Sequence, residues 1–314
     1  MNFINDLQSI LFSALISFSF LSLATFGIVL IFKTSSTTNF AQGSLGILGA
    51  YTTSYLIDKQ GVIDLTGLPS VVITSPYQLI LPMLGGIAVS FIAGLLIDTV
   101  IFRRAKYTNA ATKQIITMGL VIIITGIIPI VFGGTITRVS FPFSKESTTL
   151  LGLPMPIHQL VTLIIAFILI ISIFILLKYT KWGLGVRSVA SNERVAGLMG
   201  INTNRINAMS WAIAGALGAL SAITYTAAIG TMNSMSMIDM QVNAFYSSIL
   251  GGFSTFYGPL AGAFIFSFGQ ALFPKILVSW NLAQWSNTLL YMAIVIAILI
   301  KPVGLFGKKL AKKV

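Results

Sequence analysis

The sequence predicts an all-α protein, a polytopic transmembrane helical bundle of eight or nine spans with short or broken central helices. Two features of composition support this prediction: 56% of the 314 residues are hydrophobic and only 8% are charged, whereas a soluble domain carries about 25% charged residues. The third observation is the recurrence of apolar runs long enough to cross a bilayer. We expect a single membrane domain spanning residues 1–314.

The formal net charge of +12 does not indicate a nucleic-acid-binding protein, because the basic residues flank the apolar runs. That distribution is typical of the cytoplasmic loops of membrane proteins. The chain has no cysteine and only one histidine, His158, so we expect no disulfide and no metal site. It also lacks the HExxH, GxSxG and phosphate-loop motifs, and we expect neither enzymatic activity nor a cofactor bound by this chain.

In the first half of the chain, the apolar run 10–32 predicts a first helix, with Asp6 before it and Lys33 after it. The next span, residues 34–57, is short and polar, and its glycines recur every three residues, which allows close approach of a neighbouring helix: Gly43, Gly46 and Gly49. Polar side chains at membrane depth are costly unless they face protein or water. We expect the following to line a substrate pathway or to hydrogen-bond between helices: Asn39, Gln42, Ser44 and Tyr51.

Further spans are predicted at about 79–102, 114–132 and 160–177, with outer loops at 58–78 and 133–158. Asp98 lies near the inner end of its span, just before Arg103 and Arg104. We interpret it as a partner of these arginines at the membrane surface, the alternative being a proton relay.

The longest polar interval of the second half, residues 178–202, predicts a short helix outside the membrane. Ser191 is a suitable N-cap, and Gly200 can end the helix in the left-handed conformation. Val195, Leu198 and Met199 then share one face. Such an amphipathic helix suits docking on a soluble partner; the alternative is a helix lying on lipid headgroups.

A sixth span follows, with Asn202 or Thr203 as its N-cap and with small residues four apart that favour close packing, among them Gly218 and Ala222. The segment 241–268 is interrupted by four helix breakers: Gly251, Gly252, Gly258 and Pro259. We expect two short elements that meet there, since broken helices mark translocation pathways. Its predicted polar lining is Asn243, Tyr246, Ser247 and Ser248; the alternative is a re-entrant structural hairpin.

The last span is predicted at about 282–300 and is followed by a lysine-rich tail. With the N-terminus outside, 15 of the 19 basic residues fall on the inner side, as the positive-inside rule requires. We therefore expect a multi-pass membrane protein with its N-terminus outside and its C-terminus in the cytoplasm.

Three stretches carry a family resemblance: NFAQGSLGILGAY (39–51), ASNERVAGLMGINTNRI (190–206) and ILGGFSTFYGPLAGAFI (249–265). Together with KPVGLFG near the C-terminus, they resemble the permease subunits of branched-chain amino-acid (Liv-type) ABC importers, most closely the smaller of the two permeases. The resemblance implies a second homologous permease subunit, an extracytoplasmic solute-binding protein, and two cytoplasmic ABC ATPases that hold ATP and magnesium.

The resemblance also implies that the cytoplasmic loop of about 179–205 couples transport to the ATPases. Its coupling residues would be Arg187, Ser191, Glu193, Arg194, Ala196, Gly197, Leu198, Met199 and Gly200. The chain departs from the family near Ser191, where an acidic residue is common, and at Gln42–Gly43–Ser44, where members often have His-Gly-Glu. The implied mechanism is alternating access. The alternatives are a permease for urea, amides, ribose or nucleosides, an ATP-independent channel, and a structural or assembly protein.

Overall fold

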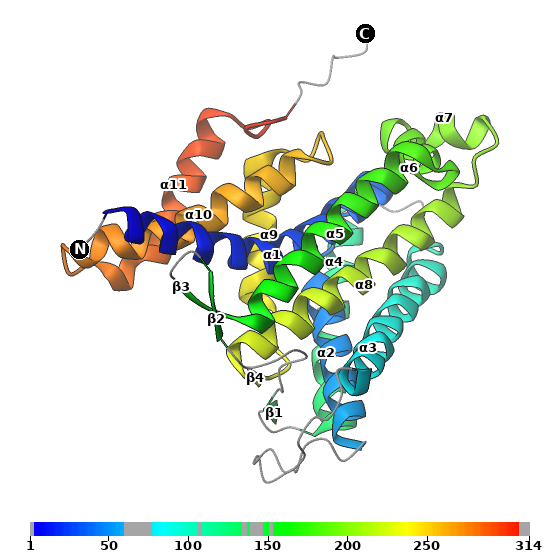
Figure 1. Ribbon diagram of the computed structural model, residues 1–314. Coiled ribbons are helices and arrows are strands. Elements are labelled where there is room, and N and C mark those ends of the chain that lie inside the picture. Colours follow the sequence, from blue (N-terminus) through cyan, green and yellow to red (C-terminus); the bar gives the residue numbers. More distant parts are fainter. Residues whose placement is uncertain are drawn as a thin grey trace.

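The computed structural model describes residues 3–59, 77–105, 109–133, 137–138, 147–150 and 153–307. These residues form a helical bundle, which confirms the predicted fold class (Figure 1). Its α-helices are α1 (Phe3–Ser35), α2 (Gln42–Lys59), α3 (Tyr77–Leu96), α4 (Ala110–Phe132), α5 (Ile157–Tyr179), α6 (Lys181–Ser191), α7 (Glu193–Leu198), α8 (Thr203–Ile229), α9 (Ile238–Gly251), α10 (Gly258–Val278) and α11 (Ser286–Ile300). A π-helical turn, η1 (Ile97–Phe102), extends α3, and a 3₁₀ turn, η2 (Ala283–Trp285), precedes α11.

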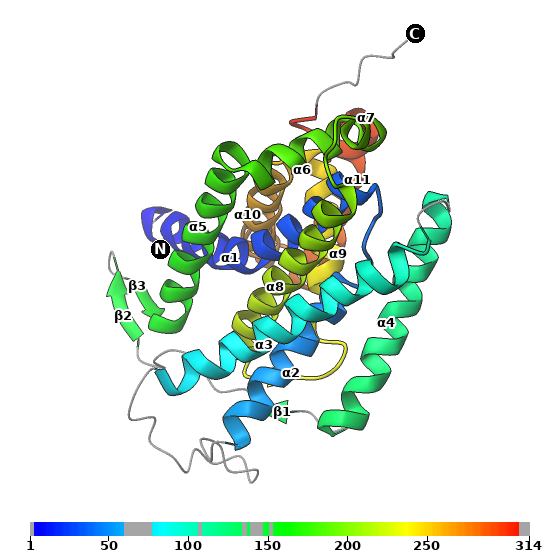
Figure 2. The ribbon, with the colours of Figure 1, turned by 90° about the vertical axis from the view of Figure 1, so that its right-hand side faces the viewer.

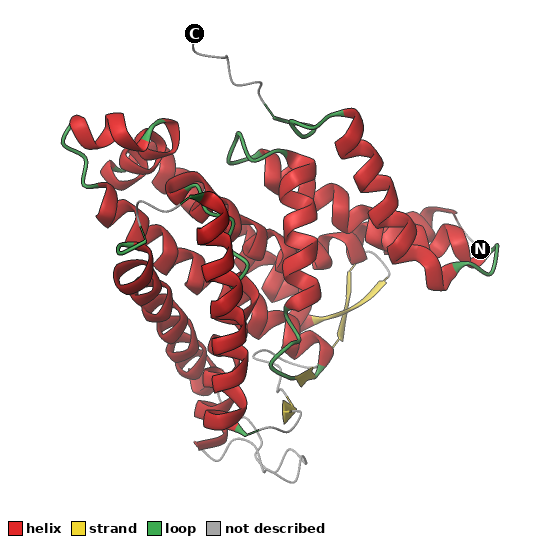
Figure 3. Ribbon diagram, turned by 180° about the vertical axis from the view of Figure 1, so that it is seen from behind, coloured by secondary structure: helices red, strands yellow, loops and turns green. Residues whose placement is uncertain are grey.

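Four short strands form two antiparallel pairs, drawn in yellow in Figure 3. Strand β1 (Thr137–Arg138) pairs with β4 (Thr231–Met232). Strand β2 (Ser147–Leu150) pairs with β3 (Leu153–Pro156), with Ser147 opposite Pro156. Most of the predicted outer loops and the lysines from 308 onward lie outside the described residues.

Seven of the described helical segments are long and apolar enough to cross a membrane. The chain is therefore a multi-pass membrane protein. Helices α2, with 18 residues, and α9, with 14, are not among these seven. They correspond to the short central helices that the sequence predicted. Counting both gives nine, the upper end of the predicted range.

Helix α8 is the centre of the bundle, and α1, α2 and α3 pack against it. The close packing depends on small residues, because a Cβ at Gly46 would lie only 2.5 Å from the carbonyl oxygen of Gly218. A Cβ at Gly215 would likewise lie 2.2 Å from the carbonyl oxygen of Ser90. Helix backbones in contact are what small-residue spacings in membrane spans predict.

The two ends of the molecule differ in the elements that they carry. Helices α6 and α7 lie at one end together with the C-terminal end of α11, while β1 and β4 lie towards the other (Figure 1, Figure 2). The segment after α11 folds back on the end of α9, where the N–H of Leu305 donates to the carbonyl of Leu250 at 2.7 Å and that of Phe306 to Gly251 at 3.1 Å. These bonds satisfy carbonyl groups that the last turn of a helix leaves without partners.

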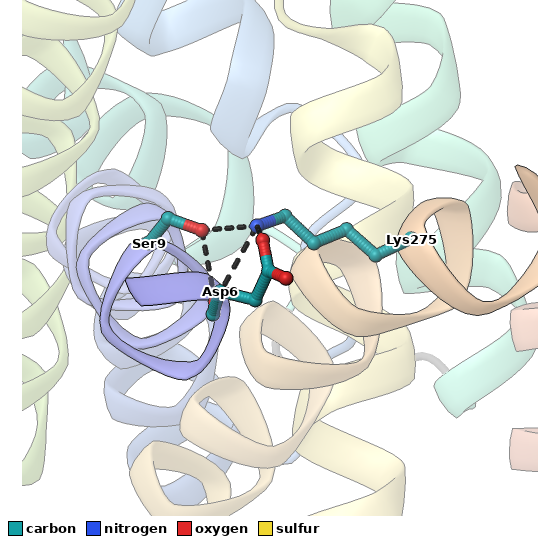
Figure 4. A network of polar contacts seen from close by, with 3 residues as sticks. All are labelled: Asp6, Ser9 and Lys275. Atoms are coloured by element: carbon teal, nitrogen blue, oxygen red, sulfur yellow. Dashed lines mark hydrogen bonds and ion pairs between the residues drawn. The ribbon is translucent and has the colours of Figure 1, made fainter. Parts of the chain in front are cut away.

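The first turns of α1 lie against the end of α10 (Figure 4). Lys275 forms an ion pair with Asp6 at 3.6 Å and also donates to the hydroxyl of Ser9. Both charged side chains are 41% exposed. Exposed pairs contribute only about 0–1 kcal/mol, so this contact orients the two helices without contributing much stability.

Candidate coupling segment and solute groove

The polar interval at 178–202 contains two helices, α6 and α7, where the sequence predicted one. The prediction that Ser191 caps the second helix is wrong. Ser191 is the last residue of α6, whereas Asn192 has an extended backbone and its side chain accepts a hydrogen bond from the N–H of Val195 at 3.1 Å. A visible sign of α6 was its own N-cap, Thr180, which accepts from Gly183 at 3.0 Å.

The end of α7 has the predicted geometry. Gly200 has a φ of +83°, in the left-handed region. The N–H of Ile201 then bonds to the carbonyl of Ala196 at 3.0 Å. This closure is the left-handed helix end that glycine favours, and it turns the chain sharply into α8.

The side chains of α7 divide into an anchored and a projecting set. Ala196 is 4% exposed and holds the helix to the bundle, whereas Leu198 is 87% and Met199 78% exposed. Val195 is also exposed, as are Gly197, Arg187 and Arg194. We call Val195, Leu198 and Met199 the apolar tip.

A small polar cavity of about 30 Å³ lies at the base of α7. It brings together the ends of α1, α3, α4, α7 and α8, and its lining is Ser35, Asp98, Phe102, Arg103, Lys113, Glu193, Asn204 and Asn207. The carboxylate of Glu193 accepts a hydrogen bond from the side-chain amide of Asn207 at 3.3 Å, which joins α7 to α8. Sequence reasoning missed Asn204 and Asn207, whose only signal was their polarity in the first turns of a membrane span.

A larger groove of about 320 Å³ lies between α2, α4 and α9; we call it the solute groove. Its lining is mainly apolar: Phe40, Gly43, Ser44, Met118, Val121, Ile122, Ser234, Met237, Ile238, Gln241 and Val242. Mostly apolar walls with a few placed polar groups are typical of small-molecule sites.

Gln241 of α9 bridges two backbone groups at the entrance to α2. Its amide oxygen accepts from the N–H of Gly43 at 2.6 Å, and its amide nitrogen donates to the carbonyl of Phe40. This residue was also missed by sequence reasoning, although it begins the polar run that includes Asn243.

A second polar link lies behind the groove. Gln42 donates to the backbone carbonyl of Ala214 in α8 at 2.7 Å and accepts from Asn39 at 3.2 Å. Gln42 and Asn39 are almost fully buried. These bonds satisfy the polar groups of the non-helical segment between α1 and α2, which is tolerated at membrane depth only when protein surrounds it.

The predicted pathway residues do not gather at one place. Ser44 lines the solute groove, whereas Tyr51 packs against the ring of Phe132. On α9, Asn243 accepts a hydrogen bond from the hydroxyl of Tyr291 at 2.8 Å, and Tyr246 stacks on the same ring. The hydroxyls of Ser247 and Ser248 bond to carbonyl groups of their own helix.

The interruption at 251–258 lies where the breakers predicted it. Helix α9 ends at Gly251, and Gly252 has a φ of +95°. Pro259 stands in the first turn of α10, where its missing N–H costs nothing. A Cβ at Gly251 would lie 2.0 Å from the carbonyl oxygen of Gly258, so the two helix ends are in backbone contact.

Comparison with known proteins identifies the family. The model of the branched-chain amino acid transport system permease component matches residues 10–299. The chain belongs to this family. Among curated relatives, it is 23% identical to the high-affinity branched-chain amino acid permease LivH of Salmonella typhimurium over 93% of both chains. It is 26% identical to a probable LivH of Methanocaldococcus jannaschii, over 96% of this chain and 92% of the relative.

A shorter match covers 40% of this permease and 37% of the autoinducer 2 import permease LsrC of Klebsiella pneumoniae, at 27% identity. No solved structure matches the chain. The family match and the full-length relatives confirm the resemblance to Liv-type permease subunits.

Proposed function

We propose that this permease subunit moves branched-chain amino acids across a bacterial inner membrane by ATP-driven alternating access, with α7 docking on a cytoplasmic ATPase. The observation that carries the proposal is the apolar tip. Leu198 and Met199 are almost fully exposed at the end of a short helix whose other side is anchored by Ala196. Exposed large apolar side chains at such a site suit a protein partner.

The anchoring of α7 supports a role in transmitting motion. Glu193 is bonded to Asn207 of α8, and α8 packs against α1, α2 and α3 at the centre of the bundle. A displacement of the apolar tip would therefore act directly on the central helix. In the alternative, α7 lies on lipid headgroups, and the apolar tip contacts lipid and no protein partner.

The remaining subunits follow from the family. We infer a second homologous permease, two ATPases that hold ATP and magnesium, and an extracytoplasmic binding protein that supplies selectivity. The N-terminus would lie outside and the coupling segment inside, since the described basic residues of α6, α7 and the start of α8 cluster at one end. This chain itself would hold no nucleotide.

Docking is tested by placing a charge on the apolar tip. Met199→Asp should abolish co-purification of the ATPases and ATP-driven L-leucine uptake into proteoliposomes, because a carboxylate cannot be buried unpaired in an interface. Met235→Asp is the matched control: Met235 is 63% exposed and lies between β4 and α9, at the opposite end from the tip. Normal ATPase association in Met199→Asp would overturn the docking role of α7.

Transport by an ATP-independent channel predicts a different result. Proteoliposomes that contain the complex but no ATP would then accumulate L-leucine to its external concentration. We expect uptake only with ATP and the binding protein present.

A further inference from the structure

We propose that the solute groove binds the α-carboxylate of an amino acid at the N-terminal turn of α2, through the hydroxyl of Ser44 and the N–H of Gly43. The inference rests on the proposed function and deepens it by naming the recognition group within the pore.

Ser44 provides the first observation. Its side chain lines the groove, and the residue is only 6% exposed. Ser44 lies in the first turn of α2, and the carbonyl four residues earlier, of Phe40, lies outside the helix and accepts from Gln241. Within the part of the chain that the structure describes, the hydroxyl of Ser44 has no hydrogen-bond partner, and it is accessible from the groove.

The N-terminus of α2 is the second observation that supports the site. Helix α2 is 18 residues long and begins at Gln42, so its first N–H groups have no carbonyl of the same helix to bond. Such a terminus favours an anion, and discontinuous helices in transporters use it for the carboxylate of the substrate. The groove lining contains no charged residue of either sign, so no charged group there repels a carboxylate or pairs with it.

Gln241 occupies the position that we propose for the carboxylate. Its amide oxygen occupies the N–H of Gly43 at 2.6 Å, the position that a carboxylate oxygen would take. A bound solute would displace it from that N–H. Because Gln241 belongs to α9, occupancy of the groove would loosen the connection between α9 and the entrance to α2.

The walls fit an aliphatic side chain. Met118, Val121 and Ile122 line the groove from α4, and Met237, Ile238 and Val242 line it from the side of α9. A volume of about 320 Å³ is at the small end of ligand sites, which suits an amino acid better than a nucleoside. The displacement of Gln241 lowers the affinity, and weak binding favours release.

The test measures equilibrium binding to the complete purified complex without the binding protein, by saturation-transfer NMR. The probes are L-leucine and L-leucinamide, which has the same side chain but a neutral amide. We expect wild type to bind L-leucine about tenfold more tightly than L-leucinamide. Ser44→Ala should lose about tenfold for L-leucine and little for L-leucinamide, since a hydrogen bond to a charged group is stronger than one to a neutral amide.

Ser267→Ala is the matched control, because Ser267 in α10 is also buried with an unbonded hydroxyl but does not line the groove. Gln241→Met frees the N–H of Gly43, so it should raise the affinity for L-leucine severalfold, a direction that simple damage to the fold does not produce. A lowered affinity in Gln241→Met, or equal binding of the two probes to wild type, would overturn the inference.

Failure of the site and failure of the proposed function are separable. If wild type carries out ATP-driven L-leucine uptake while Ser44→Ala binds L-leucine as wild type does, the carboxylate site is wrong and the transport function remains. If wild type takes up no L-leucine with ATP and binding protein, the proposed function itself fails.

Discussion

Gly46 illustrates how single atoms set the spacing of the central helices. Its missing side chain lets α2 approach α8 until the carbonyl oxygen of Gly218 fills the place of a Cβ. The atom in the way belongs to the backbone and cannot rotate aside. Gln42, four residues earlier, lies in the same contact and bonds to Ala214, so packing and polar satisfaction depend on one another here.

Gly46→Ala should therefore destabilise the bundle by about 1–3 kcal/mol, the usual cost of overpacking. The measurement is the midpoint of thermal unfolding in detergent, followed by fluorescence-detected size exclusion. Gly119→Ala in α4 is the control, because a Cβ there meets nothing within 4 Å and alanine favours the helix. Equal midpoints for the two variants would contradict the packing argument.

Helix α7 shows how a short element keeps its shape. It has six residues, too few to be stable alone. Asn192 caps the start of α7, Gly200 ends the helix, and Ala196 is buried on its inner face. The apolar tip is thus held in position while remaining free on its outer side.

The N-cap of α7 can be tested by replacing Asn192 and its neighbour Ser191 with alanine, one at a time. Asn192→Ala should weaken α7 by about 1 kcal/mol, raising amide hydrogen exchange over residues 195–199 by about fivefold. Ser191→Ala should leave exchange there unchanged, because Ser191 belongs to α6. The reverse pattern would show that Ser191 is the cap after all.

At the scale of the whole molecule, the two ends carry different elements. The apolar tip and the turn between α9 and α10 lie at one end (Figure 1). Lys33, at the end of α1, donates a hydrogen bond to the carbonyl of Ser254 in that turn. Strands β1 and β4, and the segment between β4 and α9 that contains Met235, lie towards the other end (Figure 1). In the proposed orientation, the first end faces the cytoplasm.

Cysteine labelling tests this assignment directly, because the chain has no cysteine to remove. Met235→Cys should react with a membrane-impermeant maleimide in intact cells, which have an accessible outer face. Leu198→Cys and Tyr257→Cys, both at exposed positions, should react only after the membrane is permeabilised. Labelling of Leu198→Cys in intact cells would place α7 outside and exclude contact with an ATPase.

The sequence predicted those features that depend on local chemistry. Gly251, Gly252, Gly258 and Pro259 indicated the interruption between α9 and α10, Gly200 the end of α7, and Asn202 the start of α8, where it accepts from Arg205 at 3.1 Å. The cap of α7 was placed one residue early because Ser191 and Asn192 are both good caps. Only the extent of α6, which was not recognised, decides between them.

The arrangement of the polar residues was harder to predict. Asn39, Gln42, Ser44 and Asn243 are all unusual in a membrane span, but polarity alone does not indicate which neighbour each side chain meets. Tertiary packing directs Gln42 towards α8 and Ser44 towards the groove. Gln241 was missed because its importance comes from a contact with residues 40 and 43, about two hundred positions away in the sequence.

The backbone bonds from Leu305 and Phe306 to the end of α9 have a consequence for biogenesis. Helix α9 emerges from the ribosome well before residues 305 and 306 exist, so its last carbonyls must wait for them through the synthesis of α10 and α11. The end of α9 therefore remains incomplete in the nascent protein until residues 305 and 306 have been synthesised. A chain that lacks residues 305 and 306 would leave the carbonyls of Leu250 and Gly251 without these two partners.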